Sequence, residues 1–233
     1  MVLRPSLGLE TIPESPTVSR PRPVPVPFLG LESTYDPGAA HETYKIAVIG
    51  DAGVGKTSLI SQFLNGTSPE SYSPTIEDWN ICPAIIGGRN CSLHILDTGG
   101  DEACSSILMD DWIRAVDGFM VVYAIERRRS YTESGRLYRI VSQQQRSRRA
   151  VESRTATFPA AVLIGLRMDH PRDREVSFQE ARARAGELGT EHLEFSMAPG
   201  EVDEVRLRES FGIIIRLIQR QRAGQHLGAT AIS

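Results

Sequence analysis

The feature that most constrains this chain is one glycine-rich stretch, Gly50-Asp51-Ala52-Gly53-Val54-Gly55-Lys56-Thr57. It matches the pattern G-x-x-x-x-G-K-[ST], in which glycines let successive backbone N–H groups approach a phosphate without a Cβ in the way. The apolar run 44–49 before it predicts a buried strand, and the run 57–64 after it has helical spacing. Because a helix N-terminus favours an anion, this arrangement predicts a phosphate-binding loop.

The loop motif also assigns individual roles. The Lys56 side chain is expected to reach the β- and γ-phosphates, which makes it a candidate catalytic residue, and the Thr57 hydroxyl is expected to ligate Mg²⁺. The candidate phosphate-binding residues are Gly50, Asp51, Ala52, Gly53, Val54, Gly55, Lys56, Thr57 and Ser58.

The rest of the chain alternates strands and helices. Strands are predicted at 44–49, 81–86, 91–97, 118–124, 159–165 and 192–196, and helices at 57–64, 105–115, 131–149, 177–188 and 202–222. The run Gly87–Asn90 reads as a hairpin turn, Pro83 indicates a sheet edge or bulge, and Ser177 with Glu180 has the form of a capping box. The predicted fold class is α/β, a three-layer P-loop NTPase fold with a mostly parallel six-stranded sheet and helices on both faces.

Both ends of the chain differ in composition from its middle. Most of the 14 prolines lie in residues 1–42, which we expect to form a disordered tail because it contains too little apolar surface to offset its ordering entropy. Pro21–Pro27 favours polyproline II, and Pro13–Pro16 is a minimal PxxP that leaves open a docking segment for an SH3-like module. Residues 43–222 are predicted to fold, and 223–233 to be a flexible tail.

Charge and cysteine content exclude several classes. A formal net charge of −3 argues neither for a nucleic-acid partner nor for a membrane, and no nucleic-acid partner is expected. Cys82, Cys91 and Cys104 match no metal spacing and suit a reducing compartment. With no membrane span or signal peptide recognised, the expected location is cytoplasmic. Arg127–Arg129 and the arginines between 146 and 154 are interpreted as solvated surface rather than as a site for acidic partners or phosphoinositides.

Two later stretches, Tyr72–Asp78 and Asp97–Glu102, follow the loop in an order and spacing that resemble Ras-like small GTPases, from about residue 44 to 222. The resemblance implies that the hydroxyl of Thr75 ligates Mg²⁺ and its backbone senses the γ-phosphate. It also implies that Asp97 holds the Mg²⁺ hydration shell and that the Gly100 N–H contacts the γ-phosphate. The implied cofactors are GTP or GDP and Mg²⁺.

The same resemblance implies protein partners. Ile76–Asp78 would be the effector surface, and exchange factors and GTPase-activating proteins would act on the switch. No cysteine lies near the C-terminus and Val2 excludes N-myristoylation, so no lipid anchor is expected and membrane association would come only through partners.

The chain departs from the family pattern where water is activated. Asp101 stands where the family has a glutamine that orients the attacking water by donating and accepting hydrogen bonds. An ionised aspartate can only accept hydrogen bonds, is shorter than glutamine and would lie near a polyanion. We therefore expect slow hydrolysis if Asp101 is the catalytic residue. Ala52 replaces a glycine that Ras itself has beside the γ-phosphate.

The base-recognition motifs are also altered. Leu166-Arg167-Met168-Asp169 corresponds to Asn-Lys-x-Asp, and Ser196-Met197-Ala198 to Ser-Ala-Lys. By resemblance, Asp169 accepts the guanine N–H donors, Arg167 lays its stem along the purine and Ser196 remains at the site, whereas Leu166 cannot replace the asparagine. Ser68 occupies roughly the place of a stacking aromatic.

The expected function is therefore a Ras-like GTP-binding protein that acts as a molecular switch in intracellular signalling, with slow GTP hydrolysis. One alternative is a pseudo-GTPase, a protein-interaction module whose nucleotide is absent, weak or permanently bound. An ATP-dependent P-loop kinase or ATPase fits the loop but leaves Pro74–Asp78 unexplained.

Overall fold

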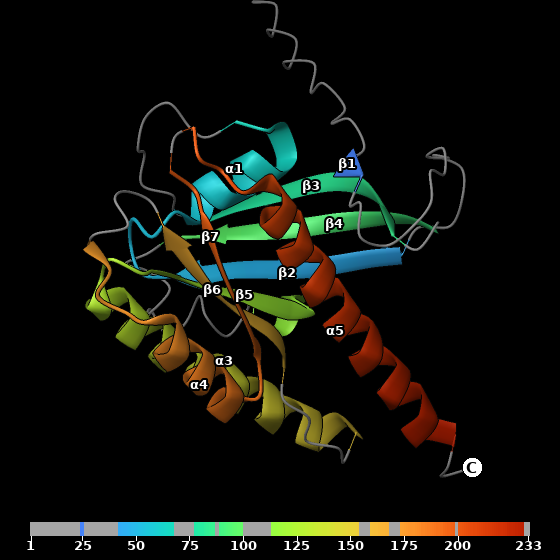
Figure 1. The fold of residues 1–233 in the computed structure, drawn as a ribbon. Coiled ribbons are helices and arrows are strands. Elements are labelled where there is room, and N and C mark those ends of the chain that lie inside the picture. The colour runs from blue at the N-terminus through green and yellow to red at the C-terminus, as the bar shows by residue number, and fades with distance from the viewer. Residues whose placement is uncertain are drawn as a thin grey trace, which may run out of the picture.

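A computed structural model describes residues 24–25, 42–67, 77–86, 89–99, 113–153, 159–167, 173–198 and 200–230. Helices cover both faces of one twisted sheet, which confirms the predicted three-layer α/β class (Figure 1). In chain order the elements are β1 (Val24–Pro25), β2 (Glu42–Gly50), α1 (Lys56–Asn65), β3 (Glu77–Ile86), β4 (Arg89–Thr98), β5 (Gly118–Ala124), α3 (Arg128–Ser153), β6 (Ala160–Arg167), α4 (Phe178–Leu188), β7 (Glu191–Ser196) and α5 (Glu204–Thr230).

Within the described residues the strand order is β1-β3-β4-β2-β5-β6-β7. All neighbours are parallel except β3 and β4, which form the predicted antiparallel hairpin. The six predicted strands are present, and the two-residue β1 adds a seventh. Arg89 and Asn90, predicted to lie in the turn, belong instead to β4, where Arg89 pairs with Ile86.

The edge prediction for Pro83 agrees with the pairing of β3. Among the described residues, β3 meets β1 only at Ala84 and Ile85, so Pro83 lies on the part of β3 that has one neighbouring strand. A proline is tolerated at the edge of a sheet because its missing N–H is not needed to pair with a second strand. At Val24–Pro25 the proline-rich segment forms strand pairs rather than polyproline II, and the remainder of the predicted tail lies outside the described residues.

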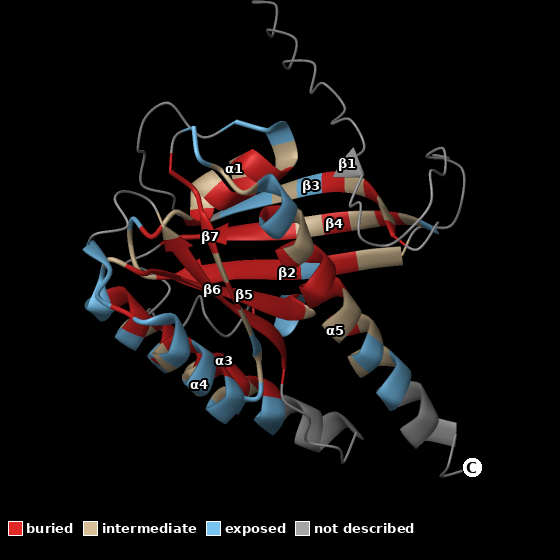
Figure 2. Cartoon of the chain, in the orientation of Figure 1, coloured by how far each residue is buried: buried red, intermediate tan, exposed pale blue. Residues whose placement is uncertain are grey.

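Two apolar cores lie on opposite faces of the sheet (Figures 1 and 2). Helices α1 and α5 cover one face and meet through the stacked rings of Phe63 and Phe211, whose centroids are 3.7 Å apart. Helices α3 and α4 cover the other face, where Tyr131 packs edge-on against Tyr123. Strands β5 and β6 are buried almost throughout because both of their faces are covered.

Three helix ends differ from or refine the prediction. Ser177 caps α4, and its Oγ accepts a hydrogen bond from the Glu180 N–H at 3.2 Å, as the capping box predicts. Helix α3 begins at Arg128 rather than Tyr131. Its first turn is basic, which is unfavourable for the helix dipole, so the sequence lacks the acidic residues that usually indicate a helix start. Helix α5 continues to Thr230, beyond the predicted end at Arg222, since no proline interrupts it.

Candidate functional site

The glycine-rich loop lies at the carboxyl end of β2, near the middle of the sheet. From β2 the chain passes through α1 to the β3–β4 hairpin on one side, and then to β5 on the other side of β2. Strand order therefore reverses beside β2, and in open α/β sheets ligands bind at such a switch point, beyond the carboxyl ends of the strands. The fold thus presents the loop at the expected ligand edge.

Glycines are required in the loop for two different reasons. At Gly50 a Cβ would lie 2.2 Å from the carbonyl oxygen of Val122 on β5, so the close approach of two strands excludes any side chain. Gly53 and Gly55 have φ angles of 64° and 98°, in the left-handed region that favours glycine. Gly55 also precedes α1 and has no side chain to cap it, which suits a helix start that receives an anion.

Lys56 crosses back over the loop from the first residue of α1. Its Nζ donates hydrogen bonds to the carbonyl oxygens of Gly50 and Asp51, each at 3.0 Å, and the residue is only 6% exposed. The loop therefore encloses a cation whose position is set by its own backbone. That Lys56 meets phosphate oxygens, as the sequence motif predicts, stays a prediction.

Candidate metal-binding oxygens lie at the same edge. Asp97, near the end of β4, pairs in register with Val48 of β2 and is buried, and the neighbouring Thr98 Oγ1 donates to the Val48 carbonyl at 2.8 Å. Thr57 lies at the start of α1. A carboxylate and a hydroxyl are hard oxygen donors of the kind that Mg²⁺ prefers. Thr75, the third predicted metal ligand, lies outside the described residues.

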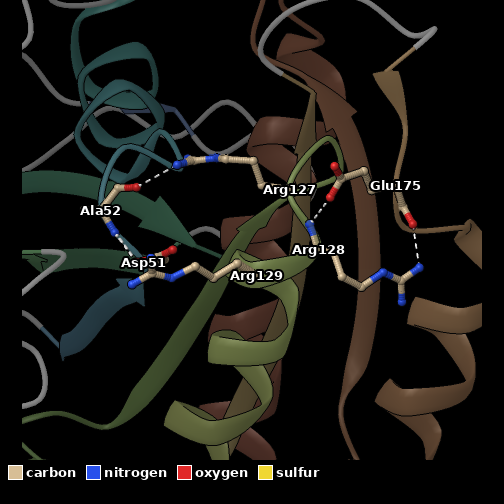
Figure 3. Close-up of a pocket in the computed structure, with 6 residues that line it drawn as sticks. All are labelled: Asp51, Ala52, Arg127, Arg128, Arg129 and Glu175. Carbon is tan, nitrogen blue, oxygen red and sulfur yellow. Dashed lines mark hydrogen bonds between the residues drawn. The ribbon is translucent and has the colours of Figure 1, made fainter.

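Arg127 is a loop contact that the sequence analysis missed. Its Nη1 donates to the Ala52 carbonyl at 3.2 Å and its Nη2 to the Gly53 carbonyl at 2.6 Å (Figure 3). The available signal was topological, since Arg127 follows β5, a parallel neighbour of β2, and so emerges at the same sheet edge. Its classification as plain solvated surface is corrected.

Arg128 is also engaged. Its guanidinium forms an ion pair with Glu180, which raises the pKa of Arg128 and lowers the pKa of Glu180, and its backbone N–H donates to Glu175. A cavity of about 480 Å³ lies beside the loop and is lined by Asp51, Ala52, Arg127, Arg128, Arg129 and Glu175 (Figure 3). Arg127 therefore bonds to the loop, whereas Arg128 is held by two glutamates.

The structure brings together two of the predicted base-pocket residues. Arg167 and Ser196 pair in register at the ends of β6 and β7. The Arg167 Nη2 lies 3.2 Å from Glu201 Oε2, and the Ser196 Oγ accepts from the Ala198 N–H at 3.2 Å. Leu166 is fully buried in the core, so it contributes packing rather than a polar contact. Gly100, Asp101 and Asp169 lie outside the described residues.

Fold and site together define a phosphate-binding-loop α/β domain, with a lysine held by the loop and a buried aspartate on the adjacent strand. Comparisons with known proteins narrow this class. The Ras family profile matches residues 45–220. "Ras-like protein 1" of Pyricularia oryzae is 35% identical over 190 residues, covering 78% of this chain and 77% of that protein. "Protein ras-2" of Neurospora crassa is 36% identical over 192 residues, covering 77% and 80%.

"Ras-like protein B" of Aspergillus fumigatus is 33% identical over 199 residues, with 79% of this chain and 81% of that protein covered. The chain belongs to the Ras family of small GTPases. Proteins of this family generally bind guanine nucleotide with Mg²⁺ and meet regulators and effectors. Among the described residues, no helix has both the length and the apolar character needed to cross a membrane.

Proposed function

We propose that this protein binds GTP and GDP with Mg²⁺ and acts as a molecular switch in intracellular signal transduction. The observation that carries the proposal is the Lys56 Nζ, which is buried and bonded to the Gly50 and Asp51 carbonyls inside a glycine turn. Burial of an ammonium group is unfavourable unless it has hydrogen-bond partners, and the loop carbonyls supply them here. The loop thus keeps a cation at the position where the nucleotide phosphates would bind. Thr57 and Asp97, with Thr75, would hold the Mg²⁺.

The switch would have the slow hydrolysis that Asp101 implies, and Ile76–Asp78 would meet effectors. Exchange factors and GTPase-activating proteins would set the proportion of each state. The location would be the cytoplasm, with membrane association through partners alone. These finer assignments follow from family resemblance at positions outside the described residues, apart from Glu77 and Asp78 at the start of β3.

A second candidate, a pseudo-GTPase interaction module, is favoured by the base side of the site. Leu166 is fully buried in the core and the Arg167 guanidinium is paired with Glu201, so neither offers the polar group that the family motif has there. One or two lost base contacts, at about 1 kcal/mol each, weaken binding roughly five- to thirtyfold. Affinity therefore separates the two candidates.

The test is to purify the full chain, identify the nucleotide it carries by chromatography of the denatured supernatant, and titrate GDP, GTP and ATP by calorimetry. Guanine nucleotide should co-purify or bind with Mg²⁺, and Lys56→Ala should abolish most of that binding. Lys45→Ala is the matched control, because Lys45 is exposed on β2. A wild-type protein that ignores all three nucleotides supports the interaction module, and one that prefers ATP contradicts both candidates.

A further inference from the structure

Four consecutive carbonyl groups of the phosphate-binding loop accept hydrogen bonds from two cationic side chains. The Lys56 Nζ bonds to the carbonyls of Gly50 and Asp51, and the Arg127 guanidinium bonds to those of Ala52 and Gly53. Lys56 belongs to the loop motif and lies on α1, whereas Arg127 comes from the β5–α3 connection. The Ala52 and Gly53 carbonyls are therefore held by a residue distant in sequence.

Holding a carbonyl also orients an amide. Each peptide unit is planar and trans, so its C=O and the N–H of the next residue point in opposite directions. The Arg127 bonds to the Ala52 and Gly53 carbonyls thereby fix the N–H groups of Gly53 and Val54. In the same way, Lys56 fixes the N–H groups of Asp51 and Ala52.

An arginine is suited to this position for a geometric reason. Its planar guanidinium presents N–H donors on two nitrogens in a fixed fork, so each of two neighbouring carbonyls receives its own donor nitrogen. Gly53 adopts a φ of 64° and has no side chain that could hydrogen-bond to the loop backbone. The guanidinium also places positive charge beside a site that receives a polyanion.

We propose that Arg127 is a positioning residue of the phosphate-binding loop, which aims the Gly53 and Val54 amides at the nucleotide phosphates and slows nucleotide release. The inference rests on the proposed nucleotide binding for its functional consequence, while the loop order that it describes is independent of any ligand. Arg128 cannot substitute, because Glu175 and Glu180 hold it.

Arg129 supplies the matched control. It lines the same cavity and has the same charge, but its side chain makes no hydrogen bond to the loop among the described residues (Figure 3). Three variants of the full chain are compared with wild type: Arg127→Ala, Arg127→Lys and Arg129→Ala. The two readouts are residue-resolved amide hydrogen exchange by NMR and the release rate of a fluorescent GDP.

In Arg127→Ala, exchange should accelerate at the Gly53 and Val54 amides more than at Asp51 and Ala52, and GDP release should be about five- to tenfold faster, as expected for loss of a charge-assisted hydrogen bond at an exposed site. Arg127→Lys should be intermediate, and it keeps the test available if the alanine variant folds poorly. Arg129→Ala should resemble wild type in both readouts.

Several results would overturn the proposal. Equal effects of Arg127→Ala and Arg129→Ala would mean that Arg127 acts only through its positive charge. Faster amide exchange spread evenly over the loop and α1 would mean that the substitution causes local unfolding. Unchanged GDP release in Arg127→Ala, together with faster exchange at Gly53 and Val54, would show that Arg127 orders the loop without slowing nucleotide release. If wild type binds no guanine nucleotide, the proposed function fails, and the amide-exchange comparison still decides whether Arg127 positions the loop.

Discussion

The hydroxyl of Tyr123 on β5 lies 3.0 Å from Nε2 of His192 on β7, so these two side chains meet above the intervening strand β6. Gly165 of β6 pairs in register with Tyr123, and its missing side chain leaves the space that the phenol ring occupies. The Tyr123 hydroxyl also donates to Glu194 Oε1 at 3.2 Å. The result is a polar link across three strands within an apolar layer.

This link predicts acid sensitivity. Burial lowers the pKa of His192, the carboxylate of Glu194 opposes this, and the cations Arg174 and Arg182 add to the lowering. The pKa of this histidine in the folded protein lies below its unfolded value of about 6.5, so the unfolded chain binds more protons between these two pKa values. The contribution of His192 to the free energy of unfolding is therefore fully present above about pH 6.5. It is lost as the pH falls from there towards the folded pKa. The unfolding free energy should therefore decrease below about pH 6.5, with a slope of up to about 1.4 kcal/mol per pH unit from His192.

Urea unfolding at a series of pH values from 7.5 to 5 measures this dependence. His192→Gln should flatten it, because the amide keeps a polar partner for Tyr123 without titrating in this range. His94→Gln is the comparison variant. Burial and Lys45 also lower the pKa of His94, so this variant measures how much of the acid slope comes from a histidine outside the link. The same acid slope in wild type and in His192→Gln would contradict the assignment.

Gly165→Ala should destabilise the fold. An added Cβ would lie 2.6 Å from the Tyr123 hydroxyl oxygen and 2.9 Å from Cγ of Glu194, so the cross-strand link would have to shift. Overpacking of this kind costs about 1–3 kcal/mol. Gly186→Ala on α4 is the control: nothing lies within 4 Å of its added Cβ, and the change should stabilise by up to about 1 kcal/mol. Denaturant midpoints measure both, and equal effects would refute the steric explanation.

Arg222→Ala should loosen the C-terminal helix from the sheet. The Arg222 guanidinium bonds to Glu42 Oε1 at 3.0 Å and to the Thr43 carbonyl and Asp117 Oδ2 at 2.8 Å each, which ties α5 to the start of β2. We expect a loss of about 1–2 kcal/mol in unfolding free energy, since several charge-assisted bonds are removed from a half-buried site. Arg136→Ala, which breaks an exposed pair with Glu133 on α3, should cost under about 0.5 kcal/mol.

Asp101→Gln should speed hydrolysis. Glutamine is neutral and has both a donor and an acceptor to orient water, whereas an ionised aspartate only accepts and repels the γ-phosphate. One additional hydrogen bond in the transition state corresponds to a rate about three- to tenfold faster. Single-turnover hydrolysis on preloaded protein separates this step from weak binding. If the native protein matches the glutamine variant, Asp101 is not the limiting feature.

Asp169→Asn should weaken GTP and GDP binding and relax discrimination against xanthine nucleotides. A carboxylate accepts both guanine N–H donors, and an amide can accept only one while offering its own donor to a xanthine carbonyl. We expect guanine affinity to fall about tenfold or more. Competition binding with GDP and XDP on both proteins measures the ratio, and an unchanged ratio would remove Asp169 from base recognition.

The sequence determined the elements whose signals are local. Apolar runs, the glycine turn before Lys56 and the Ser177 cap each depend on a few neighbouring residues, so the strands and the loop could be located from the chain itself. The helix starting at Arg128 was placed too late because its basic first turn is compensated by Glu175 and Glu180, which lie about fifty positions away. Local propensity contains no information about such partners.

Contacts between distant segments were decided only by the tertiary structure. The motif located the loop and its lysine, but parallel pairing of β2 with β5 is what brings Arg127 onto the Ala52 and Gly53 carbonyls. The same kind of pairing places Gly165 between Tyr123 and Glu194. A side chain's partner depends on which strands become neighbours, and that is set by burial of apolar faces over the whole domain rather than by spacing along the chain.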